Sequence, residues 1–118
     1  YYHWVGIYFL SGNELLLGPF VGAPSPHTRI PLDTGICGAA ARERRTVIVP
    51  DVSADPRYLA CSLETQSEIV VPIQIGDQVV GEIDIDSHTR NAFAEADRQL
   101  LEQVAARLAA VLASSEPA

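Results

Sequence analysis

The sequence predicts a single α+β domain built around a central antiparallel sheet of five to six strands. Short runs rich in β-branched and aromatic residues recur along the chain, and hairpin turns join most of them. Helical character is confined to an Ala-rich stretch and to the C-terminal segment. The chain has 118 residues, of which 47% are hydrophobic and 19% charged, so it can bury one core. We therefore treat residues 1–118 as one domain.

The expected strands follow one another in chain order. They cover residues 3–10, 15–20, 28–32, 46–49, 68–75 and 79–87. An Ala-rich helix is expected at residues 35–44, and residues 51–66 form a long loop with at most one helical turn. A loop of that length is uncommon in a small domain and is often functional.

A second helix is expected at residues 95–113, flanking the sheet. Glu95 and Asp97 suit its N-terminal end, because the helix dipole is positive there. Its apolar side chains fall on one face and are expected to face the core. This face comprises Leu100, Leu101, Val104, Leu108, Val111 and Leu112.

The charge distribution indicates which classes of ligand and partner this protein could bind. The net charge is −7, and residues 60–118 carry ten acidic side chains against three Arg. Such a surface disfavours nucleic acid and acidic membranes, and it suits a small cation or a ligand with an ammonium group. No apolar run approaches the roughly 18 residues of a membrane-spanning helix, and no segment resembles a signal peptide. With only two Cys, a reducing cytoplasm is the expected compartment.

Strand alternation makes a sharper prediction for residues 68–87. Successive side chains of a strand point to opposite faces, so the Ile and Val residues of both strands share one face and several acids share the other. Directly opposed residues of two antiparallel strands lie on the same face of the sheet. A two-residue turn would place Glu68 opposite Ile85, an acid opposite an apolar residue, and is therefore excluded. A three-residue loop at 76–78 instead pairs Ile69 with Ile85 and Glu68 with Asp86, with Asp84 one step along.

Three carboxylates on one sheet face would repel one another, since opposed Cβ atoms lie roughly 5 Å apart. Glu68, Asp84 and Asp86 therefore need an open face, a shared proton or a bound cation. A solvated outer face is the ordinary explanation. A carboxylate metal site is the least favoured, because hard-ion sites usually add loop carbonyls and Asn or Gln ligands. We favour a site for an ammonium group or another cation, and expect no metal.

The two cysteines, Cys37 and Cys61, are too few for a disulfide scaffold, and they show no zinc-ligand spacing with the three scattered His. Cys37 lies in Gly-Ile-Cys-Gly at the predicted start of the first helix, where the helix dipole would lower the pKa of its thiol. The alternative is a small apolar residue packed between glycines. Cys61 lies in the long loop.

Taken together, these segments resemble the free methionine-(R)-sulfoxide reductases, a branch of the GAF-like (PAS-like) fold. The resemblance extends over most of the chain and also implies an N-terminal helix beside the last helix, which this sequence does not include. The matching segments are Trp4-Val5-Gly6-Ile7-Tyr8, Leu17-Gly18-Pro19-Phe20, Arg29-Ile30, Gly35-Ile36-Cys37-Gly38, Ala60-Cys61, Ser67-Glu68-Ile69-Val70-Val71-Pro72 and Ile83-Asp84-Ile85-Asp86-Ser87.

By position, the resemblance implies a substrate site formed by Trp4, Tyr8, Glu68, Asp84 and Asp86. An acidic cluster would select free methionine sulfoxide, because the free amino acid has an ammonium group that the peptide-bound form lacks. An aromatic face would hold the thiomethyl group. A site built to pair a charge strongly rejects an analogue without that charge.

The resemblance also implies thiol chemistry without a bound cofactor. Cys61 would attack the sulfoxide, Glu68 would supply a proton, and Cys37 would convert the resulting sulfenic acid into a disulfide. An external reductant such as thioredoxin would reduce that disulfide. Members of this family are often homodimers, so a homodimer is a further expectation.

This sequence departs from the family pattern at His27, which stands where the family typically has a third Cys used in recycling. Either Cys37 takes over that role, or a small thiol reduces Cys61 directly, or the reductase activity is lost. Glu82 is an added acid, and Ser62 replaces an Asp. The departure keeps a second hypothesis open: a non-catalytic GAF module that binds a small ligand or senses redox state.

Overall fold

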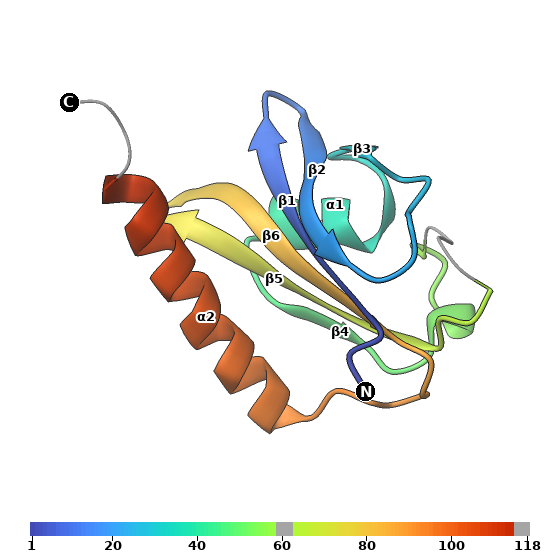
Figure 1. Ribbon diagram of the computed structural model, residues 1–118. Helices are drawn as coiled ribbons and strands as arrows, with labels where there is room; N and C mark the ends of the chain where they lie inside the picture. The colour runs from blue at the N-terminus through green and yellow to red at the C-terminus, as the bar shows by residue number, and fades with distance from the viewer. Residues whose placement is uncertain (59–62, 115–118) are drawn as a thin grey trace.

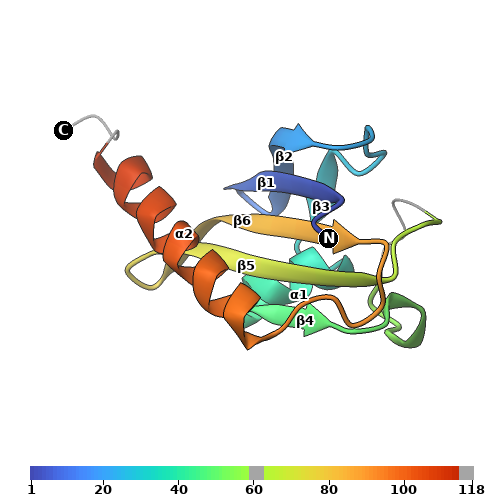
Figure 2. The same cartoon turned by 60° about the horizontal axis from the view of Figure 1, so that its bottom comes forward.

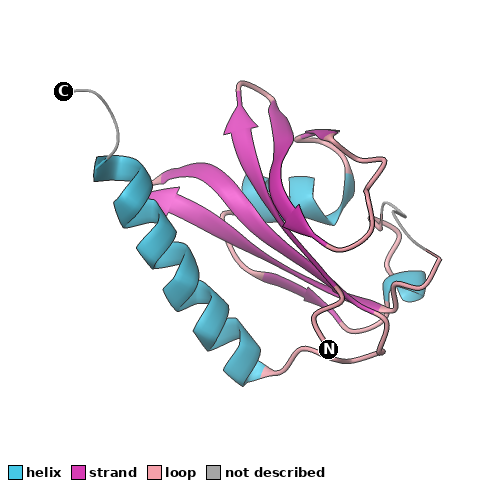
Figure 3. Ribbon diagram, in the orientation of Figure 1, coloured by secondary structure: helices cyan, strands magenta, loops and turns pink. Residues whose placement is uncertain are grey.

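The computed structural model describes residues 1–58 and 63–114, and it has the α+β architecture expected from the sequence (Figure 1). A six-stranded antiparallel sheet has the order β3-β2-β1-β6-β5-β4. Two α-helices and one short 3-10 helix complete the described part (Figure 3). In chain order the elements are β1 (Trp4–Ser11), β2 (Glu14–Val21), β3 (Arg29–Pro31), α1 (Gly35–Glu43), β4 (Val47–Val49), η1 (Val52–Ala54), β5 (Ser67–Ile75), β6 (Gln78–Ser87) and α2 (Glu95–Ser114).

The register of β5 and β6 confirms the pairing expected for the acidic hairpin. Glu68 lies opposite Asp86 and Ile69 lies opposite Ile85. The expected three-residue loop is wrong, however, because Ile75 pairs with Gln78 and leaves a two-residue turn. A β-bulge between Ile73 and Gln74 inserts one extra β6 residue, which restores the parity that a two-residue turn would otherwise reverse. The length of the turn therefore does not by itself determine the strand register in this hairpin.

Both faces of the sheet are covered, as Figure 2 shows from below. Helix α2 packs on the Ile and Val face of β5 and β6, with Ile69, Ile85 and Leu101 in one apolar cluster. Helix α1 packs on the opposite face, where Ile36 and Ala40 join Val70 in a second cluster. The solvated outer face is thus excluded for the acids, which lie on the α1 side.

Helix α2 presents only part of its apolar surface to the sheet. Leu101 and Ala105 are buried, and Leu108 and Leu112 pack against the same cluster. Leu100, Val104 and Val111, by contrast, are exposed. The expectation that all the apolar side chains of this helix face the core is therefore wrong for these three. They lie beside the buried residues on the helix surface, where the sheet does not reach. Neither described α-helix is long and apolar enough to span a bilayer.

Candidate functional site

Strand β1 brings two aromatic side chains onto the acidic face of the sheet. Trp4 pairs with Asp86, Gly6 with Asp84, and Tyr8 with Glu82. A Cβ atom at Gly6 would lie 2.2 Å from the Trp4 ring, so only glycine lets the indole lie along the strand. A glycine inside a strand is a recognisable signal of such a close approach, and it could have been read from the sequence.

The same two aromatic side chains fix the loop between β2 and β3. Trp4 Nε1 donates a hydrogen bond to the carbonyl of Ala23 at 2.9 Å, and the Tyr8 hydroxyl donates to the carbonyl of His27 at 2.8 Å. Both rings are buried. Ser25 and His27 consequently lie at the rim of the site. The sequence analysis singled out the position of His27 through the family resemblance, but it did not identify Ser25.

Helix α1 places Cys37 above the acidic strands. The helix begins at Gly35, whose φ of +73° is the left-handed conformation that glycine adopts without strain. At Gly38 a Cβ atom would lie 2.7 Å from the Leu32 carbonyl oxygen, so glycine also allows the helix to approach the preceding turn closely. Cys37 is buried and reduced.

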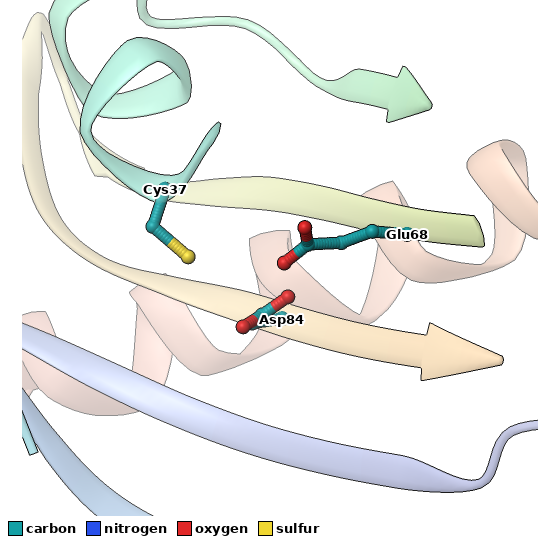
Figure 4. A group of neighbouring side chains, drawn as sticks. All are labelled: Cys37, Glu68 and Asp84. Atoms are coloured by element: carbon teal, nitrogen blue, oxygen red, sulfur yellow. The ribbon is translucent and has the colours of Figure 1, made fainter. Parts of the chain in front are cut away.

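Figure 4 shows Cys37 pointing toward the carboxyl groups of Glu68, from β5, and Asp84, from β6, which face each other. Sγ of Cys37 and one oxygen of each carboxyl group all lie within 4.8 Å of one another. Glu68 is 5% exposed and Asp84 4% exposed. The structure therefore brings together three of the predicted site residues in a closed environment.

These three side chains line a small cavity together with the aromatic wall. The cavity contains about 350 Å³ of space, part of it open to solvent. Its lining consists of Trp4, Tyr8, Ser25, His27, Ile30, Gly35, Ile36, Cys37, Glu68 and Asp84. Four of the five predicted substrate-binding residues thus share one cavity.

Asp86, the fifth, lines a neighbouring cavity instead. Trp4 and Ser25 belong to both cavities, so Trp4 stands between them. The second cavity also includes His3 and His88, whose rings stack with their centroids 4.0 Å apart. Asp86 is 3% exposed and lies directly opposite Glu68 in the sheet.

Burial and the proximity of other acids change the pKa values of Asp84 and Glu82. Burial raises the pKa of Asp84, while hydrogen bonds with Glu68 and Cys37 act in the opposite direction. Two carboxyl groups can share a hydrogen bond only if one of them holds a proton, and burial favours a proton on this pair. Burial, and then the charge of Asp84, raise the pKa of Glu82 well above its ordinary value, and interaction with the Cys37 thiol opposes them only in part.

The Cys37 thiol does not have the lowered pKa expected from its place at a helix start. Burial raises its pKa well above the ordinary value, and the charges of Asp84, Glu82 and Glu68 raise it further. Desolvation, together with the nearby acidic groups, outweighs the partial positive charge of a short helix. Cys61, the other predicted thiol, lies outside the described residues.

Chemically, this arrangement suits a small ligand with a cationic end and an apolar end. A carboxyl pair with a shared proton can accept an ammonium group and can also move a proton. The Trp4 and Tyr8 rings provide an apolar wall beside that pair. A thiol at the same site adds a group capable of redox chemistry.

Comparison with known proteins shows the family to which this chain belongs. A family model described as GAF domain matches residues 2–112. A protein of Escherichia coli (strain K12) named free methionine-R-sulfoxide reductase is 37% identical over 114 residues, which are 97% of this chain and 68% of that protein.

Two solved structures extend the comparison. One, of a type II free methionine-R-sulfoxide reductase from Thermoplasma acidophilum, matches with a TM-score of 0.90 and 42% identity, over 92% of this chain and 77% of that one. The other, of a free methionine-R-sulfoxide reductase from Neisseria meningitidis in complex with its substrate, has a TM-score of 0.88 and 40% identity, over 92% and 66%. This chain therefore spans between 66% and 77% of the length of these three relatives. The chain belongs to the GAF-domain family and, within it, to the family of the free methionine-R-sulfoxide reductases.

Proposed function

We propose that this protein reduces free methionine-(R)-sulfoxide to methionine by thiol chemistry. The observation that carries the proposal is the buried group formed by Glu68, Asp84 and Cys37 in a cavity walled by Trp4 and Tyr8. The relatives named as reductases of this substrate support the same assignment.

In substrate binding, the ammonium group of the free amino acid pairs with the buried carboxyl groups. Glu68 and Asp84 have little access to water, so their attraction for a cation is weakly screened. Asp86 adds negative charge from the neighbouring cavity. The thiomethyl end lies against the rings of Trp4 and Tyr8. Peptide-bound or N-acetylated substrate lacks the ammonium group and leaves buried carboxylates unpaired, which is costly.

In the first chemical step, the thiol of Cys61 attacks the sulfoxide sulfur while Glu68 protonates the sulfoxide oxygen. The oxygen is transferred to the thiol, so methionine leaves and Cys61 becomes a sulfenic acid. The sulfoxide sulfur is reduced by two electrons and Cys61 is oxidised by two. The proton shared by Glu68 and Asp84 is suitably placed for this transfer, since both carboxyl groups line the cavity.

In the second step, Cys37 attacks the sulfenic acid, a disulfide forms and water leaves. The thiol of Cys37 must lose its proton to do so, although burial and three acids raise its pKa. Asp84 is hydrogen-bonded to Cys37 and can accept that proton. A thioredoxin-like dithiol then reduces the disulfide and regenerates both thiols.

The deciding experiment is an assay of the purified protein with a dithiol reductant and four substrates. We expect turnover of the free R-sulfoxide, and none of the free S-sulfoxide, the N-acetylated R-sulfoxide or a peptide-bound R-sulfoxide. Equal turnover of free and N-acetylated substrate would refute ammonium recognition. Glu68→Gln should lower kcat/KM, whereas Glu95→Gln, an exposed carboxyl change at the start of α2, should not.

Thiol variants test the roles of the two cysteines. Cys61→Ser should abolish turnover, and retained activity would move the attacking thiol elsewhere. Cys37→Ser should permit one turnover with stoichiometric methionine release, yet block recycling by thioredoxin. Unchanged steady-state rates with thioredoxin would remove Cys37 from the recycling path.

A second function, a GAF module that binds the amino acid without reducing it, is favoured by one feature. His27 lines the cavity at the position where the family usually carries its recycling Cys. Calorimetric binding of free methionine sulfoxide, combined with no methionine release even in a single turnover, would support this function over the reductase.

A further inference from the structure

The group formed by Cys37, Glu68 and Asp84 has the composition of a site for a thiophilic metal ion. Its three donor atoms lie within 4.8 Å of one another, and all three side chains are buried. They come from three different elements and point toward a common centre (Figure 4). One sulfur and two oxygen donors suit Zn²⁺, whereas Mg²⁺ and Ca²⁺ prefer six or more oxygen ligands.

A second observation also indicates that this group of side chains could bind a cation. Glu82 is completely buried, and neither of its carboxyl oxygens has a hydrogen-bond partner among the residues that the structure describes. Oδ1 of Asp84 is likewise buried without a partner there. Glu82 lies on the same sheet face as Asp84, two residues away, and its charge influences the Cys37 thiol. Buried oxygens with unused lone pairs are costly, and a nearby divalent cation would offset that cost.

We propose that Zn²⁺ binds to Sγ of Cys37 and to one carboxyl oxygen each of Glu68 and Asp84. The Zn–S and Zn–O bonds form as the thiol proton and the proton held by the carboxyl pair are released to solvent, and no electron is transferred. In tetrahedral zinc sites, bond lengths of about 2.0–2.3 Å place neighbouring ligand atoms roughly 3.5 Å apart. The three donor atoms here lie within 4.8 Å of one another, so they must move closer together when the metal binds. Three protein ligands leave a fourth position open.

The consequence for activity rests on the proposed function. Zinc would occupy the place of the substrate ammonium group and would hold Cys37 as a bound thiolate. Zn²⁺ should therefore inhibit turnover competitively with respect to free methionine sulfoxide, and a chelator should restore it. Metal binding itself does not depend on the reductase activity, because it requires only the side chains named above.

Cobalt provides a direct spectroscopic probe of this site. Metal-free protein, reduced with a phosphine, is titrated with Co²⁺ while the near-ultraviolet sulfur-to-cobalt charge-transfer band is recorded. We expect a band that saturates at one equivalent and disappears when Zn²⁺ is added. Absence of the band from folded wild-type protein would overturn the proposal.

Variants show which side chains hold the metal. Cys37→Ser should remove the band, whereas Cys61→Ser should retain it; the reverse pattern would overturn the proposal. Glu68→Gln should weaken Zn²⁺ affinity by at least about 100-fold, because even indirect supporting groups cost 10–100-fold. The control Glu95→Gln should leave the affinity unchanged. An equal affinity for Glu68→Gln and wild type would remove Glu68 as a ligand and with it the three-residue site.

The two proposals fail in different ways. A cobalt band in a protein that never releases methionine would refute the reductase and leave the metal site standing. Methionine release from a protein that shows no cobalt band would refute the metal site alone.

Discussion

The buried carboxyl group of Glu82 makes the stability of this protein depend on pH in a way that one substitution should remove. Glu82 lies opposite Tyr8 in β1 and Pro72 in β5, with no exposed surface. Burial and the charge of Asp84 raise its pKa well above the ordinary value. Replacing it by Leu keeps a similar volume and removes both oxygens.

The sign of the effect follows from proton linkage. An acid whose folded-state pKa is raised keeps its proton in the folded state after the unfolded chain has released its own. Its contribution to stability is therefore complete below the unfolded-state pKa and is lost as the pH rises toward the folded-state pKa. The loss is about 1.4 kcal/mol for each pH unit in that window. Ionisation of Glu82 in the folded protein should therefore lower the free energy of unfolding as the pH rises from about 5 to about 7.

Glu82→Leu should accordingly be more stable than wild type at both pH values, and the difference should grow as the pH rises. At the lower pH the gain should be about 1–3 kcal/mol, because the substitution removes buried oxygens that have no partner among the described residues. The free energy of unfolding is measured by urea denaturation at several pH values, with a phosphine reductant present throughout. Glu95→Leu serves as the exposed control and should retain the wild-type pH dependence.

Two outcomes would contradict this reasoning. If wild type and Glu82→Leu had the same pH slope, Glu82 would not keep its proton on folding. If Glu82→Leu were less stable than wild type at pH 7, the carboxyl group would have to make favourable interactions that outweigh its burial.

Three further substitutions test the packing of the site and of the core. Gly6→Ala would place a Cβ atom 2.2 Å from the Trp4 ring, so we expect a loss of about 1–3 kcal/mol and altered Trp fluorescence; an unchanged spectrum would disprove the close approach. Tyr8→Phe removes a hydrogen bond to the rim loop and should cost about 1 kcal/mol in urea denaturation, together with a raised KM; wild-type values for both would show that this bond is unimportant. Leu101→Ala should cost about 2–5 kcal/mol, whereas Leu100→Ala, on the exposed side of α2, should change stability by about 0.5 kcal/mol or less; equal costs would contradict the assigned orientation of the helix.

Much of the fold was predictable from local patterns. The alternation of apolar and acidic side chains in residues 68–87 was enough to place Glu68 opposite Asp86, because side-chain period and hairpin pairing are both local properties. The bulge in the same hairpin was not predictable, since the extra residue changes parity without leaving a distinctive residue type. The exposure of Leu100 and Val111 was also missed, because periodicity shows that a helix has an apolar stripe and not how wide a surface will cover it.

The candidate site, like the fold, could be predicted only in part from the sequence. Local patterns in the sequence were enough to predict that acidic side chains share one sheet face, that Trp4 and Tyr8 share a strand, and that Cys37 lies near the start of a helix. That α1 and the rim loop cover this face and bury its acids could be seen only in the folded protein. That burial depends on contacts between segments far apart in the chain. Burial and the neighbouring acids reverse the expected pKa shift of Cys37, and burial raises the pKa of Glu82 well above its ordinary value.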